Sequence, residues 1–190
     1  GSGHSPFSLF QHEEEAIHEL EEKMLRGDKL PFAGLLVVPT GGGKTLIAVR
    51  WLLKNMISRG KKVLWIAHRH ELLEQAFGTI QDQALPDVLG SVASFRYRIV
   101  SGQHSKPVSI KRDDDIIIAS KDSLYKGLDY LQNNWLCYTD EVLLVVDEAH
   151  HAVAKTYRKI IDAVKDKRLS FRMLGLTATA FRTAKSEKGL

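Results

Sequence analysis

Three consecutive glycines, Gly41 to Gly43, stand directly before Lys44 and Thr45. The apolar run at residues 32–38 has the length of a buried strand, and a helical pattern follows Thr45 to about Ser58. Glycines let backbone N–H groups approach an anion without side-chain clash, and the following helix directs its positive end at the same point. The sequence therefore predicts a phosphate-binding loop between a strand and a helix.

The residues of this loop have predicted roles. Lys44 is expected to neutralise the β- and γ-phosphates of a nucleotide, and the Thr45 hydroxyl to bind Mg²⁺. The complete pattern has a glycine where this chain has Val38. An ordinary glycine-rich turn with an incidental lysine is the alternative, but the order strand, loop, helix favours nucleotide binding. The predicted nucleotide-binding residues of the loop are Pro39, Thr40, Gly41, Gly42, Gly43, Lys44 and Thr45.

An acidic pair, Asp147-Glu148, follows the apolar run at residues 142–146 and is continued by Ala149 and His150. A carboxylate at the tip of a buried strand can hold the Mg²⁺ of a nucleotide, and its neighbour can polarise an attacking water. Asp147 is predicted for the first role and Glu148 for the second, which together with Lys44 gives the predicted catalytic set. Read alone, the pair could be a solvated turn. A zinc hydrolase is disfavoured because the spacing H-E-x-x-H is absent.

The rest of the chain repeats this alternation of short apolar runs and helical patterns. Further strands are expected at residues 63–67, 95–100, 116–119 and 171–174, and helices at 8–26, 71–77 and 154–164. Such alternation is typical of a parallel sheet covered on both faces. Residues 85–112 show the least clear pattern. We expect one α/β domain with three layers and a mainly parallel sheet.

Composition limits the remaining classes. The formal net charge of +4 is compatible with a phosphate-backbone partner but does not establish one. No apolar run approaches the ~20 residues of a membrane span, and no signal-peptide pattern opens the chain. The single cysteine, Cys137, excludes an internal disulfide and a multi-thiolate zinc site, which favours a reducing, cytoplasmic location.

Three motifs resemble motifs I, II and III of superfamily 2 helicases in order and separation. They are residues 39–45, 147–150 and 177–179. Residues 67–76 are similar to motif Ia and residues 119–124 to motif Ib. Within the superfamily, the chain most resembles type III restriction enzyme Res subunits and type I restriction motor subunits, chiefly through residues 147–152 and 174–179. The resemblance covers nearly the whole chain.

This resemblance implies a RecA-like P-loop NTPase domain that uses ATP and Mg²⁺ and contacts nucleic acid. The residues implied to couple the ATP site to the strand-binding face are Thr177, Thr179 and His150. The residues implied to hold the nucleic-acid backbone are Arg69, Ser120 and Lys121. Apart from the family, Arg69 would be a solvated arginine at a helix start, and Lys121 stays open between the two interpretations.

Two departures from the family pattern concern adenine and the last loop. Related helicases carry an adenine-reading glutamine three residues before the Ala-Ile of the first helix. Glu13 stands at that position here, and Gln11 lies two residues earlier, so Gln11, Glu13 or neither reads adenine. Ala180 stands where this group usually has proline.

The resemblance also implies that residues 1–190 are one helicase ATP-binding domain, and that a second RecA-like domain, absent from this chain, supplies arginine fingers. Arg182 lies in a loop that supplies no finger in the family. Because a finger contributes ~10³–10⁵ in rate, the chain alone should be nearly inactive. The parent is expected to be an ATP-dependent DNA helicase or translocase of a restriction or repair system. An RNA helicase or translocase and a non-hydrolysing nucleotide-dependent clamp remain the alternatives.

Overall fold

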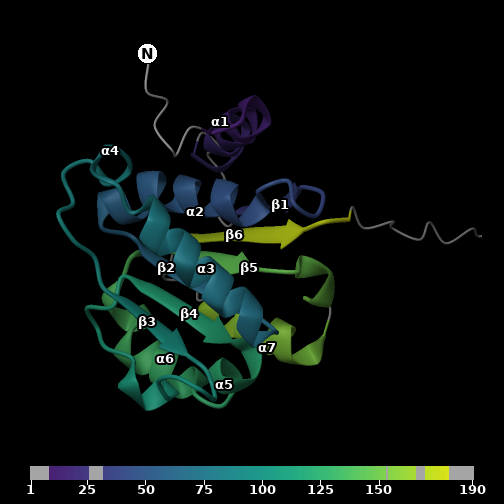
Figure 1. Ribbon diagram of the computed structural model, residues 1–190. Helices are drawn as coiled ribbons and strands as arrows, with labels where there is room; N and C mark the ends of the chain where they lie inside the picture. Colours follow the sequence, from purple (N-terminus) through teal and green to yellow (C-terminus); the bar gives the residue numbers. More distant parts are fainter. Residues whose placement is uncertain (1–8, 26–31, 153, 166–169, 180–190) are drawn as a thin grey trace, which may run out of the picture.

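A computed structural model describes residues 9–25, 32–152, 154–165 and 170–179 of the chain (Figure 1). The described strands form one six-stranded sheet in the order β1-β6-β5-β2-β4-β3, and every neighbouring pair is parallel. The strands are β1 (Phe32–Val37), β2 (Lys62–Ala67), β3 (Tyr97–Val100), β4 (Ile116–Ser120), β5 (Glu141–Val146) and β6 (Ser170–Thr177). The α/β class and the parallel sheet expected from the sequence are confirmed.

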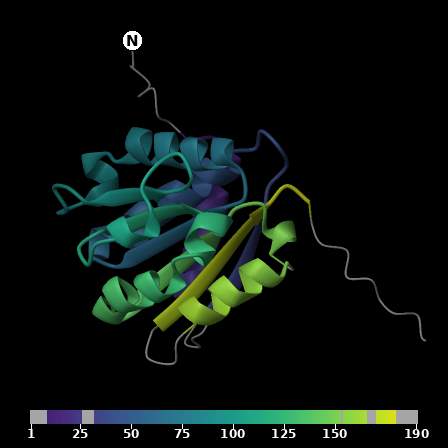
Figure 2. The same ribbon diagram turned by 90° about the horizontal axis from the view of Figure 1, so that it is seen from below.

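Helices cover both faces of this sheet. The α-helices are α1 (Gln11–Leu25), α2 (Lys44–Asn55), α3 (His70–Gln83), α4 (Pro86–Leu89), α5 (Lys121–Tyr125), α6 (Leu128–Asn134) and α7 (Lys155–Val164). Figure 2 shows α2 and α3 on one side of the sheet, with α5, α6 and α7 on the other, and α1 packs with α2. In β2, Val63 and Trp65 pack with the first group, whereas Leu64 and Ile66 pack with the second. This two-sided burial explains the unbroken apolar runs of the central strands.

Several elements differ from the sequence-based expectation. Helix α3 runs to Gln83 rather than ending near residue 77, because Ile80 and Gln83 continue its buried face past Gly78. Strand β6 extends to Thr177, three residues beyond the expected end. The unclear region 85–112 contains α4 and β3, and the short helices α5 and α6 were not expected at all. Within the described ranges, no helix is long and apolar enough to cross a membrane.

Gly175 permits a close approach of η4 to strand β6. Strand β6 lies between β1 and β5, and the turn η4 (Ala149–His151) packs on it. A Cβ added at Gly175 would lie 2.8 Å from Ala149 Cβ and 3.0 Å from Leu35 Cδ1. Such contacts are too short to be accommodated without moving the turn.

Gly175→Ala should therefore destabilise the fold by about 1–3 kcal/mol, which is typical of overpacking. Gly78→Ala is the matched control, because it lies inside α3 with nothing within 4 Å of an added Cβ. That change should stabilise the fold by up to about 1 kcal/mol through helix propensity. Urea unfolding measures both, and a Gly175→Ala protein as stable as the wild type would contradict the close packing.

Candidate functional site

The glycine loop connects β1 to α2 and keeps the first turn of that helix accessible. Gly41 and Gly43 have positive φ angles of 81° and 82°, which L side chains rarely adopt. The N–H of Gly42 donates to the Pro39 carbonyl at 2.9 Å, which closes the turn. Gly43 is the N-cap of α2, and no side chain caps the helix there. No side-chain hydrogen bond therefore caps the positive end of this twelve-residue helix.

The acidic pair meets this loop through Lys44. Lys44 Nζ donates to Glu148 Oε1 at 2.5 Å and lies 3.9 Å from Asp147 Oδ1. The sheet makes this contact possible, because β1 and β5 both pair in parallel with β6 and end at the same edge. The N–H of Asp147 donates to the Ile66 carbonyl at 2.9 Å, which continues the pairing of β5 with β2. The structure brings the three predicted catalytic residues together.

Asp147 is fully buried, and burial raises the pKa of its carboxyl to about 6. Its Oδ1 accepts a hydrogen bond from the Glu148 N–H at 2.9 Å. Its Oδ2 and the Thr45 Oγ1 are buried and have no hydrogen-bond partner. Two unpaired buried oxygens beside a lysine and an uncapped helix end fit a Mg²⁺ ion held with a phosphate group.

The backbone of Glu148 adopts a left-handed conformation, with φ 53° and ψ 55°. Among the described residues it is the one non-glycine residue with positive φ. This conformation costs of order 1 kcal/mol for a side chain with a Cβ. It turns the chain from β5 into η4, with the Glu148 carboxylate on Lys44. The hydrogen bond from Lys44 lowers the pKa of Glu148, so the carboxylate is ionised at neutral pH.

The end of β6 lies against the same loop. The N–H of Val38 donates to the Thr177 carbonyl at 3.0 Å. Thr177 is buried; its hydroxyl donates to the Thr179 carbonyl at 3.1 Å and accepts from the Thr179 N–H at 3.3 Å. His150 Nδ1 lies 3.3 Å from Glu148 Oε2. The predicted coupling residues therefore lie at two ends of the acidic site, next to the loop and next to Glu148.

A histidine cluster that the sequence-based interpretation missed extends the site toward α3. The rings of His150 and His151 lie 4.2 Å apart, and His151 lies 4.3 Å from His68, measured between centroids. His68 stands between β2 and α3, in the segment similar to motif Ia. Burial lowers the pKa of His68, which favours its neutral form. Adjacent histidines after an acidic pair were visible in the sequence, but their contact with His68 depends on the neighbouring ends of β2 and β5.

Of the two candidate adenine readers, only Glu13 lies on the phosphate loop. It is 5% exposed, and its Oε2 accepts a hydrogen bond from the Phe10 N–H at 2.9 Å. Its Oε1 fills the space that a Cβ on Gly43 would need. Gln11 is exposed and donates to Glu15 Oε1 at 2.9 Å instead.

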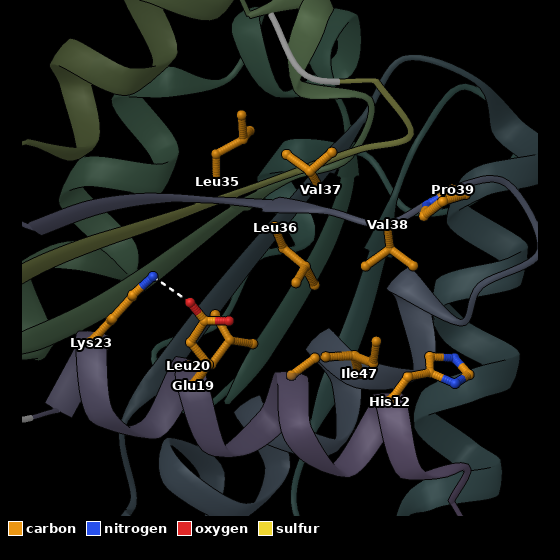
Figure 3. Close-up of a pocket in the computed structure, with 11 residues that line it drawn as sticks. His12, Glu19, Leu20, Lys23, Leu35, Leu36, Val37, Val38, Pro39 and Ile47 are labelled. Atoms are coloured by element: carbon orange, nitrogen blue, oxygen red, sulfur yellow. Dashed lines mark hydrogen bonds and ion pairs between the residues drawn. The ribbon is translucent and has the colours of Figure 1, made fainter.

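A groove of about 450 Å³ borders the loop between α1 and the edge strand β1. Figure 3 shows Leu36, Val38 and Ile47 in the space between the strand and α1, with His12 at the end near Pro39. His12 Nε2 lies 3.4 Å from the Gly42 carbonyl, a contact that was not expected from the sequence. Lys44 and the acidic pair do not line this groove, so it adjoins the phosphate site rather than containing it.

The predicted nucleic-acid contacts gather at the ends of two neighbouring strands. Ala67 of β2 is the register partner of Ser120 of β4, so Arg69 and Lys121 follow adjacent strand ends. Arg69 is exposed at the start of α3. Lys121 Nζ lies 2.6 Å from Asp122 Oδ1, and the Ser120 hydroxyl accepts the Ser123 N–H at 3.3 Å as the cap of α5. Ala180 and Arg182 lie outside the described residues.

Comparison with known proteins identifies a family and helicase relatives. The model of a family described as "Type III restriction enzyme, res subunit" matches residues 6–182. The chain is 29% identical over 185 residues to the putative ATP-dependent helicase IRC3 of Saccharomyces cerevisiae. That match covers 93% of this chain and 24% of the relative, so the chain spans about a quarter of the relative's length.

Solved helicase structures share the fold. The UvsW helicase from bacteriophage T4 has a TM-score of 0.60 at 21% identity, over 94% of this chain and 55% of that one. The yeast DEAD-box splicing factor Prp28 has a TM-score of 0.61 at 20% identity, over 95% of this chain and 49% of that one. The architecture described above is therefore the RecA-like fold of helicase domains.

The buried carboxyl of Asp147 has a measurable consequence for stability. Its pKa rises from 3.8 to about 6 on folding, so the folded state disfavours the charged form. This carboxylate consequently lowers the free energy of unfolding progressively as pH rises from about 4 to about 6. Above that range its destabilising effect has reached its full size. Asp147→Asn, which removes the charge but keeps the shape, should stabilise the protein at pH 8 by roughly 3 kcal/mol.

Urea unfolding at pH 4.5 and pH 8 measures this difference, which should fall to about a third at the lower pH, where the folded carboxyl is protonated but the unfolded one is already mostly ionised. An Asp147→Asn protein that is less stable than wild type at pH 8 would contradict the burial argument. Equal differences at both pH values would contradict it as well.

Proposed function

The chain belongs to the type III restriction enzyme res-subunit family, and we propose that its Lys44–Glu148 site hydrolyses ATP to move the full-length protein along DNA. Within that family it is the first RecA-like domain of a superfamily 2 ATP-dependent helicase. The contact of Lys44 with both carboxylates, beside the uncapped end of α2, is the observation that carries this proposal. The full-length protein is proposed to act in DNA restriction or repair.

Binding is assigned to the loop and the first turn of α2. The backbone N–H groups at residues 41–45 and the Lys44 ammonium bind the phosphates. Thr45 Oγ1 and Asp147 Oδ2, which lack hydrogen-bond partners, would hold Mg²⁺. Mg²⁺ supplies charge neutralisation at the phosphates. Pro39 and Thr40 shape the loop, and Glu13 is the better placed of the two adenine readers.

Hydrolysis is assigned to Glu148. Its carboxylate is ionised at neutral pH and can orient and polarise a water for attack on the γ-phosphate. Lys44 holds this carboxylate at 2.5 Å, and a bound triphosphate would compete for the same ammonium. Phosphate binding therefore frees Glu148 for its water. This arrangement favours an active hydrolase over a non-hydrolysing clamp.

Coupling is assigned to the residues that join the acidic site to its surroundings. His150 contacts Glu148, and Thr177 with Thr179 forms the end of β6 beside the loop. Arg69, Ser120 and Lys121 would contact the sugar–phosphate backbone from the adjacent ends of β2 and β4, which positions a strand without reading its sequence. The two sets lie along one edge of the sheet, and His151 of η4 contacts His68, the second residue before His70 and the neighbour of Arg69.

A second RecA-like domain outside this chain is proposed to complete the ATP site with arginine fingers, and residues 1–190 to form one domain of the motor. The share of IRC3 that the chain leaves unmatched supports this proposal. DNA is proposed as the track rather than RNA because of the likeness to restriction motors.

The ATP site is tested by separating binding from turnover. Lys44→Ala should weaken binding of ATP·Mg²⁺ by at least about 100-fold, since it removes a charge-assisted contact of about 3 kcal/mol. Glu148→Gln should retain binding but lower DNA-stimulated phosphate release by the full-length protein at least 100-fold. The present chain alone should show only trace release. Calorimetric titration and a steady-state phosphate assay measure these effects.

Lys54→Ala is the matched control, because Lys54 lies at the other end of α2 and pairs with Glu21. It should bind ATP as the wild type does. Unchanged affinity in Lys44→Ala would refute the phosphate site, and rapid hydrolysis by this chain alone would refute the two-domain mechanism.

The track is tested by the salt dependence of binding. In the full-length protein, Arg69→Gln and Lys121→Gln should each weaken DNA binding uniformly across sequences and lower the salt slope by about one phosphate contact. Arg59→Gln is the control, since Arg59 is exposed in η1 (Ile57–Arg59), which precedes β2 at the opposite edge of the sheet. Tighter binding to RNA than to DNA of the same sequence would show that RNA, not DNA, is the track. An unchanged salt slope would show that Arg69 and Lys121 do not contact the phosphate backbone.

A further inference from the structure

Three side chains with metal-binding atoms converge beside the start of α3. His70 and Glu74 are one turn apart on that helix, and His104 comes from the loop after β3. His104 Nε2 lies 3.0 Å and His70 Nε2 lies 3.5 Å from Glu74 Oε1. The two imidazole rings are 5.2 Å apart between centroids. This group shares no residue with the ATP site.

We propose that His70, Glu74 and His104 form a zinc site that fastens the loop after β3 to α3. Residues at i and i+4 of a helix present their side chains on one face, which places His70 and Glu74 as a pair. Zinc bound at ~2.0–2.1 Å in a tetrahedron has ligand atoms about 3.3 Å apart. The two measured separations from Glu74 Oε1 lie on either side of that value, so small side-chain movements would complete the set.

The loop that carries His104 is already ordered for this role. Ser101 is buried, and its Oγ lies 2.9 Å from His104 Nδ1. The N–H of Gln103 donates to the same hydroxyl at 3.3 Å, and the N–H of Ser105 donates back to the Ile99 carbonyl at 3.1 Å. With Nδ1 engaged by Ser101, Nε2 is the atom that faces Glu74. Metal-binding histidines are usually oriented by such a partner on the other ring nitrogen.

The donor set points to zinc rather than to magnesium or calcium. Two imidazoles and one carboxylate suit zinc and similar transition ions, whereas magnesium and calcium prefer oxygen ligands throughout. Three protein ligands leave a fourth position for water. The opposing interpretation is an ordinary hydrogen-bonded cluster, in which Glu74 pairs with a protonated histidine. The two interpretations share the same contacts and differ in whether zinc binds.

The position of the site gives zinc a structural consequence. His70 directly follows Arg69, and the loop after β3 begins at the same sheet edge because β3 pairs in parallel with β4. A metal joining His104 to α3 would fix two segments that only side chains connect at this point. Binding to the folded state alone would stabilise the protein in proportion to the zinc concentration.

Calorimetric titration of zinc chloride into the metal-stripped protein, without nucleotide or magnesium, tests the proposal. The wild type should bind one equivalent at this site. His104→Gln, His70→Gln and Glu74→Gln should each lower that affinity at least 10-fold, and Ser101→Ala about 10-fold through loss of orientation. His18→Ala, on the exposed face of α1, and His151→Ala, in the other histidine cluster, are controls that should leave it unchanged.

Thermal unfolding provides the second measurement. Zinc should raise the Tm of the wild type and of both controls, and should leave the Tm of His104→Gln unchanged although that variant is folded by circular dichroism. Zinc affinity that is undiminished in His104→Gln, or that is lost in His151→Ala, would overturn the assignment. No binding to the wild type at 100 µM zinc would show a hydrogen-bonded cluster only. Failure here leaves the ATP site untouched, since His70, Glu74 and His104 do not belong to it.

Discussion

The ion pair between Lys44 and Glu148 joins segments that are 104 positions apart in the chain, at 2.5 Å. Nothing local produces that contact. It exists because β1 and β5 lie on either side of β6 in a parallel sheet, so that the loops after both strands leave from one edge. Gly175 in β6 lets η4 pack closely over the strand between them. The parallel arrangement of the strands thus brings the candidate catalytic residues together at one edge of the sheet.

Several features of this edge lower stability and are understandable only as parts of a binding site. Asp147 is buried with a pKa raised by burial, and two buried oxygens, including that of Thr45, lack partners. Glu148 holds a left-handed backbone, and the N-terminus of α2 has no side-chain cap. A sequence selected for stability alone would correct each of these. A triphosphate with Mg²⁺ would supply partners for the helix end, Lys44 and both unpaired oxygens at once.

The sequence predicted the features that depend on local order. A strand, three glycines, Lys44 and a helix are contiguous, and an acidic pair at the end of an apolar run is equally local, so the fold class and the central residues followed directly. Features that depend on long-range packing were missed. Helices α5 and α6 are too short to show periodicity, and α3 continues past Gly78 because α2 covers Ile80 and Gln83. Glu13 beside Gly43, and His104 beside Glu74, arise from segments that only the folded chain brings together.

Lys44 is expected to exchange its carboxylate partners for a phosphate group when the nucleotide binds. A crystal structure of this chain with Mg²⁺ and a non-hydrolysable ATP analogue tests it directly. We predict the β- and γ-phosphates against the backbone N–H groups at residues 41–45, Mg²⁺ beside Thr45 Oγ1, and Lys44 Nζ moved from Glu148 to a phosphate oxygen. Phosphates bound elsewhere, such as in the groove between α1 and β1, or an unbroken Lys44–Glu148 pair with the analogue present, would contradict the account.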